Sequence, residues 1–145
     1  MKRFIRCLSL ILAFSMCFVV PVSADEETTP WSSNYFMSRS AYLYKTSDTQ
    51  FEVWFEVTAL DGMDELGTSE IKVQRSPDKE TWTTMSTYKK AVYPQMVGYN
   101  TGDHSDCVTY YSASSGYYYR AYVEFYAKKG TGTAYYGYYT SAILI

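Results

Sequence analysis

Two stretches of the chain alternate between apolar and polar residues with a period of two. In residues 50–60, QFEVWFEVTAL, the apolar set is Phe51, Val53, Phe55, Val57 and Ala59. In residues 116–129, GYYYRAYVEFYAKK, it is Tyr117, Tyr119, Ala121, Val123 and Phe125. Because successive side chains of a strand point to opposite faces, this pattern predicts two strands with one buried and one solvated face, which is typical of antiparallel sheets.

Turn-forming residues divide the rest of the chain into further strands. Residues 77–80, PDKE, separate the β-rich runs 70–76 and 81–88, and because proline presets φ and aspartate caps the local backbone, they predict a hairpin. The acidic stretch 61–67, DGMDELG, predicts a solvated loop. The other expected elements are a strand at 39–46, a connection at 89–102 with one short strand near 95–99, a strand at 105–112, and a closing strand at 134–145 with a bulge or kink at Gly137.

These elements predict one all-β domain. Helical periodicity is missing after the N-terminal leader, and turn signals recur about every 8–12 residues, as in β-sandwiches. We therefore expect a single antiparallel β-sandwich of about seven strands over residues 38–145, preceded by a flexible acidic lead-in at 25–37, which begins DEETTP.

Residues 1–24 have the organisation of a secretory signal peptide. Three basic residues precede an apolar run at 7–20, and Val22-Ser23-Ala24 offers small residues for cleavage after Ala24. The apolar run is shorter than the roughly 20 residues that span a membrane. The sequence therefore predicts a secreted, extracellular protein that does not insert into the membrane after cleavage.

Removal of this leader changes both the charge and the cysteine content. Three of the 13 basic residues leave with it, so that ten remain against 15 acidic ones and the net charge becomes −5. An acidic protein is a poor ligand for nucleic acid or anionic lipid. Cys7 and Cys17 also leave, so Cys107 would remain alone and no internal disulfide is expected.

Two stretches of the sequence are similar to known protein modules. They are the hairpin at 73–87, VQRSPDKETWTTMST, and residues 109–145, which contain GYYYRAYVEFYAKKG. They resemble the C-to-C′ and E-F-G strands of fibronectin type III and related immunoglobulin-like modules. The whole chain also looks like small, uncharacterised secreted proteins of Gram-positive bacteria that share a GYYYR strand. The resemblance implies an immunoglobulin-like fold but no activity. Two departures are that Trp54 falls on the side of Glu52 and Glu56 instead of the core side, and that no proline-rich first strand is present.

Candidate catalytic groups are few. His104 and Cys107 lie three residues apart, a pair that can bind a metal or form a thiol–imidazole pair, but a polar turn that enters a strand explains them better. Glu52 and Glu56, taken to be about 7 Å apart on one strand face, invite comparison with glycosidase carboxylates, yet they are ordinary solvated residues. The loop at 61–67 only partly matches a calcium loop. We expect no enzyme activity, no cofactor and no metal.

Tyrosine is the compositional bias that remains. All 17 tyrosines lie after the leader, and runs such as 117–119 must place tyrosines on both strand faces. We expect a binding surface formed by Trp54, Tyr118, Tyr122 and Tyr126, provided that the strand order puts them together. Its ligand would be an extracellular carbohydrate or a cell-wall polymer, because such rings stack on sugars. Two alternatives remain: tyrosine simply suits half-wet strands, or the chain is a protein-binding or bacteriocin-like effector that acts through an exposed edge at 142–145.

Overall fold

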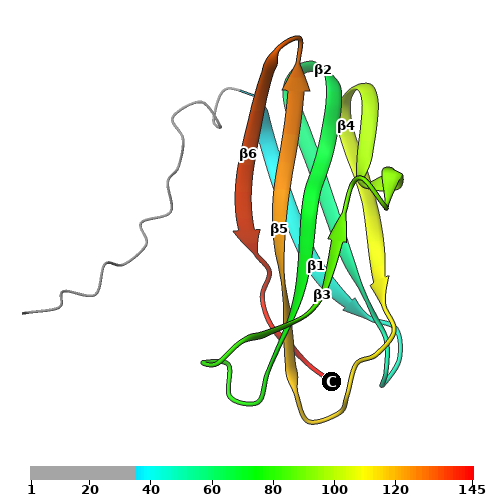
Figure 1. Cartoon of the computed structure of the whole chain (residues 1–145), viewed down its shortest axis with the longest axis vertical. Coiled ribbons are helices and arrows are strands. Elements are labelled where there is room, and N and C mark those ends of the chain that lie inside the picture. Colours follow the sequence, from blue (N-terminus) through cyan, green and yellow to red (C-terminus); the bar gives the residue numbers. More distant parts are fainter. Residues whose placement is uncertain (1–34) are drawn as a thin grey trace, which may run out of the picture.

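The computed structural model describes residues 35–145, so the predicted leader at 1–24 and most of the predicted lead-in at 25–37 lie outside the described part of the chain. The longest element is the 26-residue strand β2 (Phe51–Ser76). The other elements are β1 (Phe36–Lys45), β3 (Thr83–Lys89), the short 3-10 helix η2 (Pro94–Met96), β4 (Val97–Tyr110), β5 (Tyr118–Lys129), β6 (Gly132–Tyr139) and β7 (Ile143–Leu144). The seven strands form one antiparallel sheet, which confirms the all-β prediction (Figure 1).

Strand β2 organises this sheet because four other strands pair with it. Its first half pairs with β1 on one side and β4 on the other. Its second half pairs with β5 on one side, and on the other with β4 as far as Gly67 and then with β3. Strand β6 then pairs with β5, and β7 extends the sheet beside the first residues of β5. In Figure 1, β1 and the first half of β2 lie behind the surface made by β6, β5 and the second half of β2.

The sheet curls so that its two halves enclose the core. The ring of Phe51, in the first half of β2, lies 5.2 Å from the ring of Tyr119 on β5, although these strand segments are not paired. The apolar sets predicted for residues 50–60 and 116–129 face this core. Their buried members are Phe51, Val53, Phe55, Val57, Ala59, Tyr119, Ala121, Val123 and Phe125.

The predicted loop at 61–67 is wrong, because β2 runs through it without a break. Pairing with β4 is interrupted only between Thr58 and Met63, where the strand bends from one half of the sheet to the other. Met63 and Leu66 are buried, and Gly67 pairs with both β4 and β5. Glycine and acidic residues favour a turn locally, but strand partners on both sides override that preference. A Cβ on Gly67 would overlap the carbonyl oxygen of Met96, so glycine lets η2 approach.

The predicted hairpin at 70–88 is confirmed. Strand β3 pairs with the end of β2, and the connection is held by Ser76 and Asp78. The Asp78 carboxylate accepts the backbone N–H groups of Glu80 and Thr81, both at 2.9 Å, and these hydrogen bonds lower the pKa of Asp78. Lys79, between Asp78 and Glu80, takes a left-handed conformation with φ of 67°.

Three other expectations are corrected. Strand β4 begins at Val97 and runs through Gly102, so the predicted connection at 89–102 and the strand at 105–112 are largely one element. The register of β5 against β6 is unbroken across Gly137, so this glycine makes no bulge. A Cβ at Gly137 would instead overlap the phenol of Tyr122, which crosses β6 there. The closing strand is divided into β6 and β7.

Side chains join the edges of the curled sheet. The Arg39 guanidinium of β1 lies 3.9 Å from the ring centroid of Tyr136 on β6 and 5.1 Å from that of Phe36. On the other side, the Tyr88 hydroxyl of β3 donates to the Thr109 carbonyl of β4 at 3.0 Å. Between residues 35 and 145, no helix has the length and apolar character to cross a membrane.

Candidate functional site

The outer surface of the first half of the sheet carries an aromatic cluster around Trp54. Register pairs Tyr42 of β1 directly with Trp54 of β2, and Tyr44 with Glu52. We call the four residues Tyr42, Tyr44, Glu52 and Trp54 the aromatic platform. They line a hollow of about 210 Å³. A second hollow of about 190 Å³ shares Tyr42 and Trp54 and is otherwise lined by Phe55 and Glu56 of β2 and Ser105 of β4.

The platform combines exposed rings with a fixed indole. Tyr42 and Tyr44 retain 53% and 59% of their surface in solvent. The indole Nε1–H of Trp54 donates to Glu52 Oε2 at 2.7 Å, which restrains the ring on its strand. Ala41 is buried and Leu43 is partly buried on the opposite face of β1, so the core side of this edge strand holds both tyrosines outward.

Sequence reasoning named Trp54 but missed Tyr42 and Tyr44. The signal was present in the stretch RSAYLYKT, where these tyrosines alternate with Ala41 and Leu43. A short polar turn at 46–50 joins this strand to β2, and such a connection makes the two strands neighbours. That rule pairs Tyr42 and Tyr44 with residues near Trp54.

Tyr118, Tyr122 and Tyr126 lie elsewhere, so the expectation that Trp54 joins them on one surface is wrong. All three belong to β5 and pair with the second half of β2, at Ser76, Lys72 and Gly67. Their side chains point outward from the opposite half of the curled sheet. The strand order could not be derived from the sequence, and it separates Trp54 from the other three residues.

Each of these three tyrosine rings lies beside a lysine of the protein itself. The ammonium group is 4.4 Å from the ring centroid for Lys79 and Tyr118, 5.6 Å for Lys72 and Tyr122, and 3.4 Å for Lys90 and Tyr126. Tyr126 is only 3% exposed, contrary to its predicted place on a solvated face. Burial raises the pKa of Tyr122 and of Tyr126. Because these lysines lie over the rings of Tyr118, Tyr122 and Tyr126, the three rings are less accessible to a ligand than the rings of the aromatic platform.

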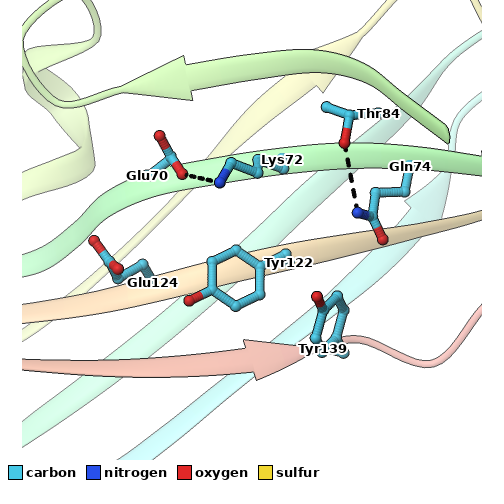
Figure 2. A pocket seen from close by; sticks show the side chains of 7 residues that line it. All are labelled: Glu70, Lys72, Gln74, Thr84, Tyr122, Glu124 and Tyr139. Atoms are coloured by element: carbon cyan, nitrogen blue, oxygen red, sulfur yellow. Dashed lines mark hydrogen bonds and ion pairs between the residues drawn. The ribbon is translucent and has the colours of Figure 1, made fainter. Parts of the chain in front are cut away.

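Around Tyr122 the surface forms a wider hollow of about 470 Å³, which we call the Tyr122 hollow (Figure 2). Its lining comes from four strands and consists of Glu70, Lys72, Gln74, Thr84, Tyr122, Glu124 and Tyr139. Lys72 forms an ion pair with Glu70 at 2.6 Å, and this hydrogen bond lowers the pKa of Glu70 and raises that of Lys72.

His104 and Cys107 do not form a common site. In the register with β2, His104 pairs with Val57 and Cys107 with Trp54, so the two side chains lie on opposite faces of β4. His104 Nε2 donates to the Gln95 carbonyl at 2.9 Å. Burial, with added repulsion from Glu52 and Asp106, raises the pKa of the Cys107 thiol. Within residues 35–145 no group of three or more metal-binding side chains gathers.

Glu52 and Glu56 are also poorly placed for paired-carboxylate chemistry. They are four residues apart on β2, which corresponds to roughly 13 Å of strand rise. The 7 Å spacing assumed from the sequence is therefore wrong. Glycosidase carboxylates lie about 5–9.5 Å apart, so this pair is outside the range for either retaining or inverting hydrolysis.

Comparison with known proteins adds little to this geometry. No protein-family model matches the chain, and no curated protein matches it. Among solved structures, it is similar to the sporulation control protein Spo0M from Bacillus subtilis, with 9% sequence identity and a TM-score of 0.42. That match covers 71% of this chain, and the chain spans 47% of the length of Spo0M.

Proposed function

We propose that this chain is a non-catalytic binding module that recognises a glycan through the aromatic platform. One observation carries the proposal: Tyr42, Tyr44 and Trp54 gather around one hollow on an outer sheet surface, with Glu52 fixing the indole. Exposed aromatic rings offer flat apolar surface to the C–H faces of a sugar ring, and their polar tips can hydrogen bond to its hydroxyl groups.

The arrangement of the two hollows favours an extended ligand. Both are walled by Tyr42 and Trp54 and follow the direction of β1 and β2. Glu52 lines one hollow and Glu56 the other, so each has a carboxylate acceptor for sugar hydroxyls. Two acidic groups disfavour a polyanionic glycan, because like charges repel. The proposed ligand is therefore a neutral or amine-bearing polysaccharide chain that occupies at least two consecutive positions.

The setting that we propose for this activity follows from the sequence. A signal peptide at 1–24 would export the chain, and the domain would meet extracellular or cell-wall polysaccharide. We further propose that the curled sheet is a β-sandwich of the immunoglobulin or fibronectin type III kind. The packing of the two sheet halves against each other at Phe51 and Tyr119 supports this proposal.

The test is calorimetric titration of the protein with a panel of neutral, acidic and amine-bearing cell-wall and plant polysaccharides. Calorimetry is preferred because Trp54→Ala removes the tryptophan at the binding surface, while the fluorescence of Trp31 and Trp82 remains. We expect Trp54→Ala to abolish binding and Tyr42→Ala to weaken it about five- to 150-fold, since stacked rings contribute about 1–3 kcal/mol each.

Tyr111→Ala is the matched control. This tyrosine is 70% exposed but lines neither of the two hollows, so its loss should leave affinity unchanged. Binding by none of the polysaccharides, or equal affinity in Trp54→Ala and the unsubstituted protein, would refute the proposal.

A protein-binding role remains an alternative, but the C-terminal residues favour it less than expected. Ile145 is buried, its N–H donates to the Tyr117 carbonyl, and Ile143 packs partly against the core. Strand β7 is thus paired with β5, and Leu144 is the exposed apolar side chain at this end. The alternative stays a prediction.

A further inference from the structure

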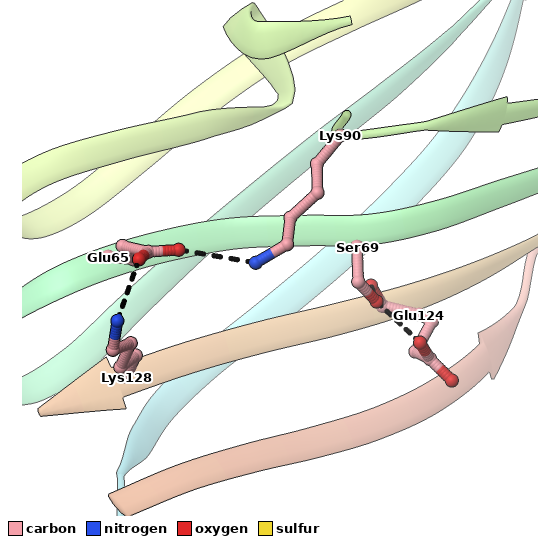
Figure 3. A network of polar contacts seen from close by, with 5 residues as sticks. All are labelled: Glu65, Ser69, Lys90, Glu124 and Lys128. Carbon is pink, nitrogen blue, oxygen red and sulfur yellow. Dashed lines mark hydrogen bonds and ion pairs between the residues drawn. The ribbon is translucent and has the colours of Figure 1, made fainter. Parts of the chain in front are cut away.

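On the outer surface of the second half of the sheet, two glutamates each form ion pairs with two lysines of the protein. Glu65 lies 3.2 Å from Lys90 and 3.2 Å from Lys128 (Figure 3). Glu70 lies 2.6 Å from Lys72 and 3.6 Å from Lys89. On this surface, negative charge is regularly balanced by lysine.

Glu124 departs from this arrangement. It pairs directly with Glu70 across β2 and β5, so two carboxylates stand side by side. Within residues 35–145 no lysine or arginine forms an ion pair with Glu124. The Ser69 hydroxyl donates to its Oε1 at 2.5 Å (Figure 3), and Glu124 is one of the residues that line the Tyr122 hollow (Figure 2).

Two aromatic rings line the same hollow as this carboxylate, with Tyr122 between Glu124 and Tyr139 (Figure 2). The rings of Tyr122 and Tyr139 lie 5.1 Å apart and are inclined by 56°. Of the tyrosine rings on this surface that have a lysine above them, Tyr122 has the most distant one, because Lys72 is held by Glu70. Gly137 provides the space in which the Tyr122 phenol lies across β6.

We infer that the Tyr122 hollow binds a protonated primary amine carried by the ligand. The ammonium group would form an ion pair with Glu124 Oε2 and lie against the electron-rich face of Tyr122, which completes the pattern that Glu65 and Glu70 already satisfy with lysine. A hollow of about 470 Å³ has room for one amino sugar or one lysine side chain. This site is separate from the aromatic platform and does not depend on its function.

The test is an NMR titration of the full domain with two amine probes, the tetramer of glucosamine and Nα-acetyl-lysine amide. Their N-acetylated forms serve as uncharged controls of nearly the same shape. We expect both or one of the amines, and neither acetylated form, to shift the backbone amides of residues 70–74 and 122–124. Which amine binds distinguishes an amino-sugar source from a lysine source.

Substitutions test whether Glu124 is the group that binds the amine. Glu124→Gln keeps an acceptor for Ser69 but removes the charge, and we expect it to weaken amine binding about tenfold. Glu65→Gln is the matched control, because it removes a carboxylate charge from the same surface outside the hollow. Tyr139→Ser, at an exposed ring, gives a second measure if Glu124→Gln fails to fold.

Four results would overturn the inference. Three of them are equal shifts with amine and acetylated probes, equal affinity in Glu124→Gln and Glu65→Gln, and no shifts at all. Amine binding that is lost in Trp54→Ala but kept in Glu124→Gln would place the amine on the aromatic platform instead and would likewise overturn it.

Discussion

The indole N–H of Trp54 points along its own strand and donates to Glu52, two residues earlier, at 2.7 Å. Both residues lie on the outer surface beside Tyr42 and Tyr44, so a hydrogen bond within one strand fixes the orientation of the central ring. The carboxylate thus positions the ring as well as lining the hollow. Substitution of Glu52 can therefore test its effect on the orientation of the Trp54 ring and its effect on glycan affinity.

We predict that Glu52→Ala frees the Trp54 ring while Glu52→Gln holds it. The glutamine amide oxygen keeps an acceptor at the same place, whereas alanine leaves none. The readout is the indole NMR cross-peak of Trp54, which should move and exchange faster with solvent in Glu52→Ala alone. Glycan affinity should fall about tenfold in the alanine variant. An unmoved cross-peak would show that Glu52 does not orient the ring.

Gly67→Ala should destabilise the fold by about 1–3 kcal/mol, the usual cost of overpacking. A Cβ at this position would overlap the backbone of Met96, and backbone cannot rotate away as a side chain would. Gly62→Ala is the control, because a Cβ at Gly62 has no neighbour within 4 Å. Urea denaturation of both variants measures the difference. If the two variants are equally stable, η2 does not press on β2 as described.

Arg39→Ala should cost about 1 kcal/mol of unfolding free energy by opening the edge between β1 and β6. The guanidinium lies between the rings of Phe36 and Tyr136, so its removal leaves both rings without their cation. Arg39→Lys keeps the charge but loses the planar stack, and an intermediate value is expected. Hydrogen exchange of β6 amides locates the effect. Faster exchange spread evenly over all strands would argue against a role at this edge.

Acid should destabilise the protein through Glu65 and Glu70. Hydrogen bonds from Lys72 hold the pKa of Glu70 below its ordinary value of 4.5. At Glu65, burial raises the pKa, but hydrogen bonds from Lys90 and Lys128 outweigh burial and lower it. A carboxylate with a lowered folded-state pKa stabilises the fold above the unfolded-state pKa, and this contribution is lost as pH falls through the folded-state pKa.

The thermal midpoint should therefore decline as pH is lowered from about 5 to about 3, and the decline should be shallower in Glu70→Gln. Glu56→Gln is the control, because it replaces an exposed glutamate that forms no ion pair within residues 35–145. Parallel pH profiles for the unsubstituted protein and Glu70→Gln would show that the ion pairs of Glu70 do not contribute.

The sequence predicted the strands whose burial alternates and the hairpin closed by Asp78. Those features depend on neighbours a few residues apart, so they are visible in a single chain. The continuity of β2 through residues 61–67 was not visible, because it depends on β4 and β5, which pair with it from far along the sequence. Trp54 was identified as a candidate, whereas its separation from Tyr122 follows from strand order, which the pattern of residues does not encode.

The dependence of four strands on β2 also determines how the chain can acquire its structure. During synthesis, the first half of β2 has only β1 as a partner until β4 has been made, since Phe51 pairs with Tyr110. The second half likewise lacks β5 until that strand has been made, since Ser76 pairs with Tyr118. Such distant pairings slow folding, because the intervening chain must be closed into loops first. In that interval an apolar strand edge is open to other copies of the chain. Slow folding and early aggregation are thus the expected liabilities of a sheet organised around one strand.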